Sequence, residues 1–288
     1  MLHADRKITL KIFPKFCYFL GLLLVSFTYS PGQTVRGAIL SKKTQEPLPY
    51  AHIGIVGTSN GTISDENGRF SLALENADAG DSVRISMLGY QPQIHLAGAL
   101  KKQETLKILL VPAAIELTEV EVRNIQGEDH KEIGHQSESE KIVTGWSRPK
   151  SGGERGILLK FPGRKTALVE KIHFHIARST YDSLMFRVHF YEAHKKWPGR
   201  EVTPRDIFIK TQKSNGWVQA DLEDQQIILE SKTIVTLEIV EAWASHSKGV
   251  LLLSANLFGG AIYHKEASED KWQKARRTSA SIFLDVRY

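Results

Sequence analysis

The sequence contains very little cysteine: Cys17 is the one cysteine among 288 residues. Because Cys17 lies in an apolar N-terminal segment, the rest of the chain carries no thiol. Outside that segment, the chain cannot form a disulfide, a thiolate metal site or a cysteine nucleophile. His-Glu-x-x-His and the glycine-rich phosphate-binding fingerprints are also absent, so neither a zincin protease nor a nucleotide-binding site is predicted.

Long stretches with helical periodicity are absent as well. Segments of about five to eight residues alternate apolar and polar side chains instead, and clusters of Gly, Pro, Asn and Asp separate them. This pattern predicts an all-β protein. A serine hydrolase of the strand–turn–helix type is not expected, because the pattern provides no βαβ unit.

The first 32 residues differ in composition from the rest. Four basic residues precede an apolar run from Phe16 to Tyr29, and Ser30, Pro31 and Gly32 follow it. This order is typical of a secretory signal peptide. The alternative is an uncleaved anchor, but the run is shorter than the roughly 20 residues of a spanning helix. A lipidated cysteine would follow the apolar run, whereas Cys17 begins it. We therefore predict a signal peptide at residues 1–32 and an exported protein of the periplasm, outer membrane or exterior.

The net charge depends on that segment. The whole chain has a formal charge of +6, and residues 1–32 contribute four basic residues and one acid, which leaves +3. No stripe of Lys and Arg remains, so no nucleic-acid partner is expected. Membrane contact is expected only through the signal segment or an outer-membrane partner.

Residues 33–112 are predicted to form a small β-sandwich. Seven strand-like segments run from Thr34–Leu40 to Thr105–Leu110. Asn60-Gly61 and Asn67-Gly68 supply the positive-φ positions that tight hairpins need. Sheets with one buried face pack in pairs, which favours a sandwich.

The same segment resembles a known family. Its strings, in order, are Val35-Arg-Gly37, Pro47-Leu-Pro-Tyr-Ala51, Gly57-Thr-Ser-Asn-Gly-Thr62, Asp65-Glu-Asn-Gly-Arg-Phe70 and Leu88-Gly-Tyr90. They resemble the carboxypeptidase D regulatory-like domain. The resemblance implies a prealbumin-like seven-stranded β-sandwich, found at the N-terminus of TonB-dependent receptors and of other exported bacterial proteins. It implies a fold and carries no catalytic site.

Two larger activities associated with that family are not expected here. A zinc carboxypeptidase would need a chelating histidine–glutamate pair, a distant histidine and a separate glutamate base. The stretch Leu117–Val122 resembles the strand that leads into a receptor plug, but fewer than 170 residues follow it. We therefore expect neither a peptidase nor a complete receptor.

Residues 113–143 are predicted to be a linker with a short strand. Gln126–Lys141 is polar and charged, with few apolar side chains to offset the entropy of ordering. This segment is expected to be mobile.

Residues 144–288 are predicted to form a second β-sandwich, of jelly-roll type, with eight to ten strands. Within it, the stretches Phe186–Glu192 and Gly216–Leu222 are similar to C-terminal β domains of exported bacterial proteins. The strand Leu184–Tyr191 alternates most clearly. It is expected to point Leu184, Phe186, Val188 and Phe190 inward, and Met185, Arg187, His189 and Tyr191 outward.

Histidines on two predicted strands are the candidate metal ligands. His173 and His175 project from one face of their strand, and His189 or His194 could join them from the next strand. Such a cluster could hold zinc, copper or nickel. Because no carboxylate is placed with these residues and a third ligand is uncertain in position, we predict no metal and no cofactor, with His173, His175 and His189 as candidates.

All five tryptophans lie in the second domain: Trp146, Trp197, Trp217, Trp243 and Trp272. Trp197 and Trp272 have polar neighbours and are expected in exposed loops, where they could contact a glycan or a protein. The alternative is that most of the tryptophans pack in the core.

These patterns predict a non-catalytic exported protein that binds or scaffolds at the bacterial cell envelope. The candidate partners are a glycan or an envelope protein. One alternative is a hydrolase with dispersed residues in the second domain, and another is an accessory component of a TonB-dependent uptake system.

Overall fold

The computed structural model describes residues 34–103, 105–113, 129–147, 151–161, 166–230, 232–244 and 249–288. The predicted signal peptide and the receptor-like stretch Leu117–Val122 lie outside these residues. Thr34–Tyr288 forms one structural unit. Among the described residues, no helix is both long enough and apolar enough to span a membrane.

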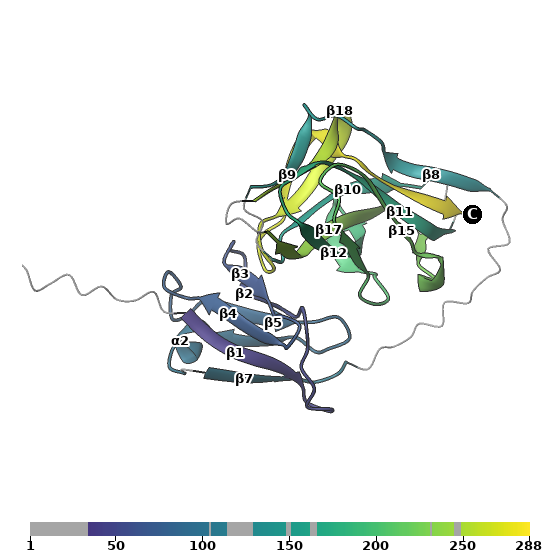
Figure 1. Cartoon of the computed structure of the whole chain (residues 1–288). Coiled ribbons are helices and arrows are strands. Elements are labelled where there is room, and N and C mark those ends of the chain that lie inside the picture. Colours follow the sequence, from purple (N-terminus) through teal and green to yellow (C-terminus); the bar gives the residue numbers. More distant parts are fainter. Residues whose placement is uncertain are drawn as a thin grey trace, which may run out of the picture. The chain divides into compact units, whose positions relative to one another are not determined.

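Seven strands in two sheets make up the N-terminal part of this unit, as the sequence predicts (Figure 1). One sheet has the order β4-β1-β7 and the other β3-β2-β5-β6. The strands and one short helix are β1 (Thr34–Ser41), β2 (His52–Ile55), β3 (Gly61–Ile63), β4 (Arg69–Ala73), β5 (Ser82–Ser86), β6 (Gln93–Leu96), α2 (Ala97–Leu100) and β7 (Thr105–Leu110). β1 and β7 are parallel, whereas the other pairs are antiparallel.

Alternation explains how these strands form a core. In β1, Val35 and Ile39 are buried, and in β5, Val83 and Ile85 are buried. These side chains belong to one hydrophobic cluster that both sheets share, so the two sheets pack face to face as a sandwich.

Thirteen strands make up the larger C-terminal part (Figure 1). They are β8 (His130–His135), β9 (Val143–Ser147), β10 (Glu154–Lys160), β11 (Thr166–Ser179), β12 (Ser183–His194), β13 (Trp197–Glu201), β14 (Phe208–Thr211), β15 (Gly216–Asp221), β16 (Ile228–Glu230), β17 (Lys232–Trp243), β18 (Val250–Lys265), β19 (Gln273–Ala280) and β20 (Ile282–Arg287). A short 3-10 helix, η2 (Glu223–Gln225), joins β15 to β16. The all-β fold class is therefore confirmed, with more strands than the eight to ten predicted.

The long strand β18 belongs to both layers of this part. Its first residues pair with β9 and β11, and its last residues pair with β10 and β19. Phe174 of β11 meets Phe186 of β12 edge to face, with ring centroids 5.0 Å apart. The two layers therefore pack their inner faces together, as in a sandwich.

The predicted linker is wrong over part of its length. Residues 130–135 form strand β8, which pairs with β20 in antiparallel register. Its side chains are mostly exposed, but Ile133 packs against the hydrophobic core. Backbone pairing, rather than apolar side chains, orders this charged segment, as at many sheet edges.

The predicted outward face of β12 is also wrong. Met185, Arg187, His189 and Tyr191 are buried, at 2%, 3%, 3% and 9% exposure. Alternation correctly separates the two faces of the strand, but structure covers both of them. The charged residues on the second face therefore need partners inside the protein.

Candidate functional site

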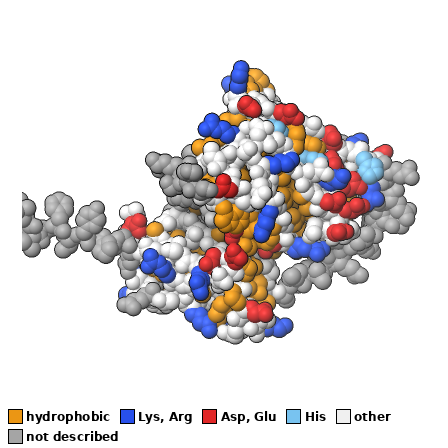
Figure 2. Space-filling model, viewed as in Figure 1, with side chains coloured by type: hydrophobic (Ala, Val, Ile, Leu, Met, Phe, Trp, Pro, Cys, Tyr) orange, Lys and Arg blue, Asp and Glu red, His pale blue; other side chains and the backbone are white. Residues whose placement is uncertain are grey.

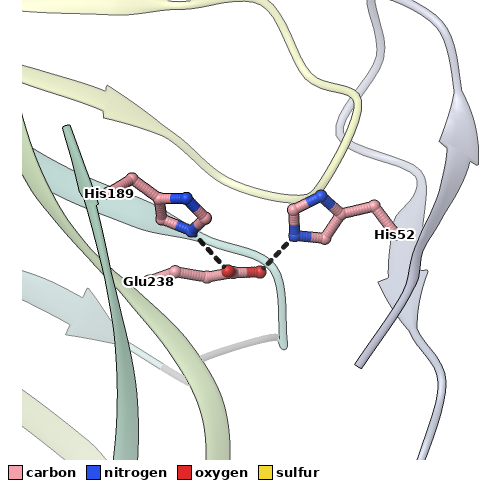
Figure 3. Close-up of side chains that lie close together, drawn as sticks. All are labelled: His52, His189 and Glu238. Atoms are coloured by element: carbon pink, nitrogen blue, oxygen red, sulfur yellow. Dashed lines mark hydrogen bonds and ion pairs between the residues drawn. The ribbon is translucent and has the colours of Figure 1, made fainter. Parts of the chain in front are cut away.

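Three strands bring a glutamate and two histidines together (Figure 3). β17 positions Glu238, β12 positions His189 and β2 positions His52. His189 Nε2 lies 2.8 Å from Glu238 Oε2, and His52 Nε2 lies 2.8 Å from Glu238 Oε1. Because β2 belongs to the N-terminal sandwich, Glu238 links residues of both β regions.

The guanidinium of Arg187 completes this group. Its Nε donates to Glu238 Oε2 at 2.6 Å, and its Nη1 donates to Asp206 at 3.3 Å. Its Nη2 lies 2.6 Å from His52 Nε2. A guanidinium has no acceptor atom, so His52 Nε2 cannot accept from Arg187 and donate to Glu238 at the same time.

A second buried carboxylate, Glu154, lies on the neighbouring strand β10. Lys265 Nζ contacts Glu154 Oε1 at 2.8 Å. Thr236 Oγ1 and Tyr191 Oη donate to Glu154 Oε2 at 2.6 and 3.2 Å. The carboxylate is thus paired and hydrogen-bonded, the condition under which a buried charge is tolerated.

Burial and charge together fix the protonation states in this cluster. Burial disfavours a charged His189, but Glu154 and Glu201 outweigh it and raise the pKa of His189 to about 10. Burial likewise opposes ionisation of Glu238, but Arg187 and the neighbouring imidazoles hold its pKa well below 4.5. Despite burial, His189 lowers the pKa of Glu201 to about 2. At neutral pH His189, Glu201 and Glu238 are therefore ionised and paired with one another.

His52, His189 and Glu238 are close enough to be considered as metal ligands, with ligand atoms within 4.8 Å of one another. However, His189 contacts carboxylates with both ring nitrogens, at 2.6 Å to Glu201 and 2.8 Å to Glu238. An imidazole that donates from both nitrogens is protonated and has no lone pair for a metal. Arg187 already supplies a cation to Glu238. The geometry therefore favours an ion-pair network over a metal centre.

The predicted histidine cluster does not assemble. His173 contacts Asp285 at 2.9 Å and stacks on Phe283, whereas His175 contacts Ser254 at 2.8 Å. His189 belongs instead to the Glu238 network. The prediction that no carboxylate accompanies these histidines is wrong for two of them. His173 contacts Asp285, which is distant in sequence, and His189 contacts Glu201 on the next strand and the distant Glu238.

Two sequence motifs that are typical of hydrolases do not form a catalytic site in the structure. His-x-x-Glu occurs at His135–Glu138 and at His189–Glu192. His189 and Glu192 lie on strand β12, where residues three apart point to opposite faces, and Glu192 pairs with Arg200. Glu138 follows the end of β8 and accepts a hydrogen bond from Trp217.

Gly57-Thr-Ser-Asn-Gly61 has the Gly-x-Ser-x-Gly spacing, but it connects two antiparallel strands, β2 and β3. A nucleophile elbow needs a strand followed by a helix, so this serine is not placed for that chemistry.

The two tryptophans predicted in exposed loops differ. Trp197 begins edge strand β13 and is 43% exposed, with its ring edge-on to Tyr263 at 6.2 Å. Trp272 is half-buried, packs edge-on against Tyr191 at 5.7 Å, and lies below Lys265. Trp197 is therefore available to a ligand, and Trp272 instead covers the ion-pair network.

A loop between β18 and β19 forms a second link between the β regions. Arg84 of β5 donates to Glu269 at 3.0 Å, and Ser268 Oγ donates to the Thr62 carbonyl at 2.7 Å. Gly54 permits this approach: a Cβ there would lie 3.0 Å from the Glu269 Cβ. A small apolar cluster of Ile63, Met185 and Val240 lies beside these contacts.

Sequence reasoning missed Glu238, Glu154 and His52, although a signal is present. Glu238 interrupts the apolar run Ile234–Val240, and His52 stands beside apolar residues in Ala51–Ile55. Charged residues within apolar strands are rarely buried unless they are paired. Such interruptions point to a buried ion-pair network, but they do not identify the partners.

The family comparison concerns the N-terminal part. Residues 35–122 match the family model for the CarboxypepD_reg-like domain. The N-terminal part of the chain therefore contains a CarboxypepD_reg-like domain. The predicted resemblance is confirmed, and the match ends at 122 rather than at the predicted 112.

The CarboxypepD_reg-like domain also has a curated relative. The TonB-dependent receptor SusC of Bacteroides thetaiotaomicron is 38% identical over 73 residues, which cover 25% of this chain and 7% of that receptor. Since the matched part is a small fraction of the receptor, the likeness concerns this domain alone.

One solved structure aligns over 82% of this chain and 50% of its own chain. It contains the cysteine protease and lectin-like domains of Cwp84, a surface layer associated protein of Clostridium difficile, with a TM-score of 0.41 and 9% identity. A similarity of this size supports no statement about activity.

Proposed function

We propose that this chain is an exported, non-catalytic protein that binds or scaffolds at a bacterial cell envelope. The main observation is that the ionisable groups gathered around Glu238 are paired with one another across the two β regions. His189 uses both nitrogens on carboxylates, so it has no free site from which to act as a base. A network arranged in this way holds domains together rather than activating a substrate.

The family comparison supports the envelope location. A CarboxypepD_reg-like domain is shared with the TonB-dependent receptor SusC. The predicted signal peptide at residues 1–32 is consistent with export. In this proposal, the CarboxypepD_reg-like domain is a structural base, and the C-terminal β region presents the binding surface.

The experiment is expression of the full chain in a two-membrane bacterial host, followed by fractionation and substrate assays. We expect the protein in the envelope fractions and no turnover of peptide or ester substrates. Retention of the intact chain in the cytoplasm would contradict export.

Turnover in these assays would support the hydrolase alternative. A cleft of about 470 Å³ borders the Glu238 network and is lined by residues that include His189, Glu201 and Lys265. An enzyme using that cleft would lose activity in Glu201→Gln while remaining folded, whereas contaminating activity would be unaffected.

The SusC likeness favours a second candidate function, as an accessory component of a TonB-dependent uptake system. The test is co-purification of the tagged full chain with barrel receptors from envelope extracts. Specific recovery of one receptor would support this function, and recovery equal to that of an unrelated exported control would oppose it.

A further inference from the structure

The charged side chains described in one groove of the C-terminal region are all positive. The groove has a volume of about 810 Å³ and lies among β8, β10, β18 and β19. Among the described residues that line it, five carry cationic side chains and none carries a carboxylate; the cations are Lys160, Lys196, Lys274, Arg276 and Arg277. A cleft lined by one sign of charge concentrates the electrostatic field and attracts counter-ions.

These five cations lack acidic partners within the described part of the chain. Lys274 donates to the Tyr263 hydroxyl at 2.8 Å, which leaves its charge uncompensated. Elsewhere, cations commonly pair with carboxylates, as Arg84, Arg155, Arg187, Arg200 and Arg287 do. The groove therefore brings together like charges that no described side chain neutralises.

The neighbouring His135 reflects this environment. Burial and the positive charge of Lys160 lower its pKa. At neutral pH, His135 is an uncharged imidazole that can donate or accept a hydrogen bond in the groove.

An irregularity in the β18–β19 pair presents an aromatic ring at the same groove. The register shifts between Leu257 and Ala261, and Phe258 and Arg277 adopt left-handed φ values of 64° and 68°. Phe258 is 83% exposed. Left-handed backbone at a bulky residue is unfavourable and is retained mainly at functional positions, so this exposed ring is a second indication of a ligand.

A second aromatic ring lies beside the groove, next to the groove residues Lys274 and Tyr263. Trp197 lies 6.0 Å from Lys274 Nζ, measured to its ring centroid, and packs edge-on against Tyr263. Aromatic faces pack well against the apolar faces of sugar rings, and cations beside them contact acidic groups on the same polymer.

We propose that this groove binds an anionic polysaccharide whose sugar rings carry carboxylates. Several cations in one groove match a polymer with repeated acidic groups better than a single anion. Phe258 and Trp197 provide surfaces for the sugar rings, while Arg276 and Lys160 contact carboxylates. On the face drawn in Figure 2, basic, acidic and hydrophobic side chains are interspersed, so that view offers no broad basic surface for a nucleic-acid duplex.

This inference rests on the proposed binding function and adds the chemical class of the ligand. Binding is measured in solution, so failure to bind would overturn this inference alone, and cytoplasmic retention in the fractionation experiment would overturn the export proposal alone.

The experiment is calorimetric titration of the full chain with polygalacturonate oligosaccharides, and with neutral dextran oligosaccharides of equal length. We expect binding of the acidic chain that weakens as salt rises from 50 to 500 mM, because screening weakens exposed ion contacts. Lys160→Gln/Arg276→Gln should weaken binding by at least about tenfold, as expected for two lost charge-assisted contacts. Phe258→Gly should also weaken it.

The matched control is Lys42→Gln/Lys43→Gln, which removes the same charge from exposed positions. It should bind as the unmodified protein does. Equal binding of dextran, unchanged binding by the groove variant, or binding only to duplex DNA or to phosphatidylglycerol vesicles would overturn the proposal.

Discussion

At the scale of single residues, the Glu238 network shows why charge can be buried in a β protein. Arg187 and His189 approach one carboxylate from the same strand, and His52 approaches it from another sheet. The desolvation cost of each group is offset only while all its partners remain. The network is therefore sensitive to the loss of any one member.

Glu238→Gln should be strongly destabilising. The substitution keeps the size of the side chain but removes one of the two counter-charges of the buried Arg187 and His189 side chains, and only Asp206 and Glu201 remain. We expect the free energy of unfolding to fall by about 3–5 kcal/mol, measured by urea denaturation. The control is Glu192→Gln, whose partner Arg200 is fully exposed and which should leave stability essentially unchanged. Equal effects of the two substitutions would contradict the assigned network.

The same groups set the pH dependence of stability. The pKa of His189 rises from 6.5 to about 10 on folding, so its contribution is complete below pH 6.5 and is lost as pH rises through 10. The pKa of Glu201 falls from 4.5 to about 2, so its contribution is complete above pH 4.5 and is lost as pH falls through 2.

From these two residues we expect maximal stability between about pH 4.5 and 6.5. Denaturation midpoints measured from pH 2 to 10 test this. His189→Asn should flatten the alkaline side relative to the unmodified protein. A midpoint that keeps rising between pH 7 and 10 would be incompatible with a protonated His189.

The alternating pattern of β12 correctly predicted that one face is buried and wrongly predicted that the other face is exposed. Alternation reports which side chains share a face, and it placed Phe186 and Phe190 in the core. It does not report what covers the other face. Arg187 and His189 were placed outward because their partners Glu238 and His52 are distant in sequence, and that pairing is a property of the folded chain.

At the scale of elements, turn residues and apolar–polar alternation were sufficient to predict the positions of the strands in the N-terminal sandwich. Each of its seven strands coincides with a predicted segment, because Gly, Asn and Pro residues mark the turns at which the strands end. In the larger part, Val250–Ser254 and Gly260–His264 read in the sequence as two strands separated by glycine, but both belong to the single strand β18. The pair Gly259-Gly260 within this strand resembles a turn signal in the sequence.

Amino-acid composition alone does not predict strand β8. Its charged sequence predicted a linker, but its backbone pairs with β20. Gly134 adopts φ 141°, and a Cβ there would lie 2.3 Å from the Ile282 carbonyl oxygen.

Gly134→Val should therefore release β8 from the sheet edge. We expect amide hydrogen exchange across His130–His135 to accelerate strongly, with a loss of about 1–3 kcal/mol in stability. Gly80→Ala, where an added Cβ meets nothing within 4 Å, serves as the control. Fast exchange of β8 amides in the unmodified protein would instead support the linker interpretation.

The contact between β2 and the β18–β19 loop gives a second prediction at this scale. Gly54→Val should force apart the Gly54 backbone and Glu269, because both the Glu269 side chain and the Gly61 Cα lie about 3 Å from the added Cβ. We expect a loss of about 1–3 kcal/mol from overpacking and faster proteolysis of the 266–272 loop. Unchanged stability and unchanged cleavage would show that the loop does not contact β2 in solution.

At the scale of the whole molecule, direct contacts join the two β regions into one structural unit. The ion-pair network and the Arg84–Glu269 contact join the CarboxypepD_reg-like domain to the larger region. The groove lies wholly on the larger region. The family domain would then act as a base for a separate binding surface, a relation that family resemblance alone could not predict.

The most direct test of this coupling uses the distribution of tryptophan. All five tryptophans lie between residues 146 and 272, so fluorescence reports unfolding of the larger region alone. His52→Ala/Arg84→Ala alters only the CarboxypepD_reg-like domain. Thermal unfolding of the full chain followed by tryptophan fluorescence should show a midpoint at least about 2 °C lower in this variant. The exposed pair Lys42→Ala/Lys43→Ala should leave the midpoint unchanged. An unchanged midpoint in His52→Ala/Arg84→Ala would mean that the two β regions unfold independently, and would contradict the account.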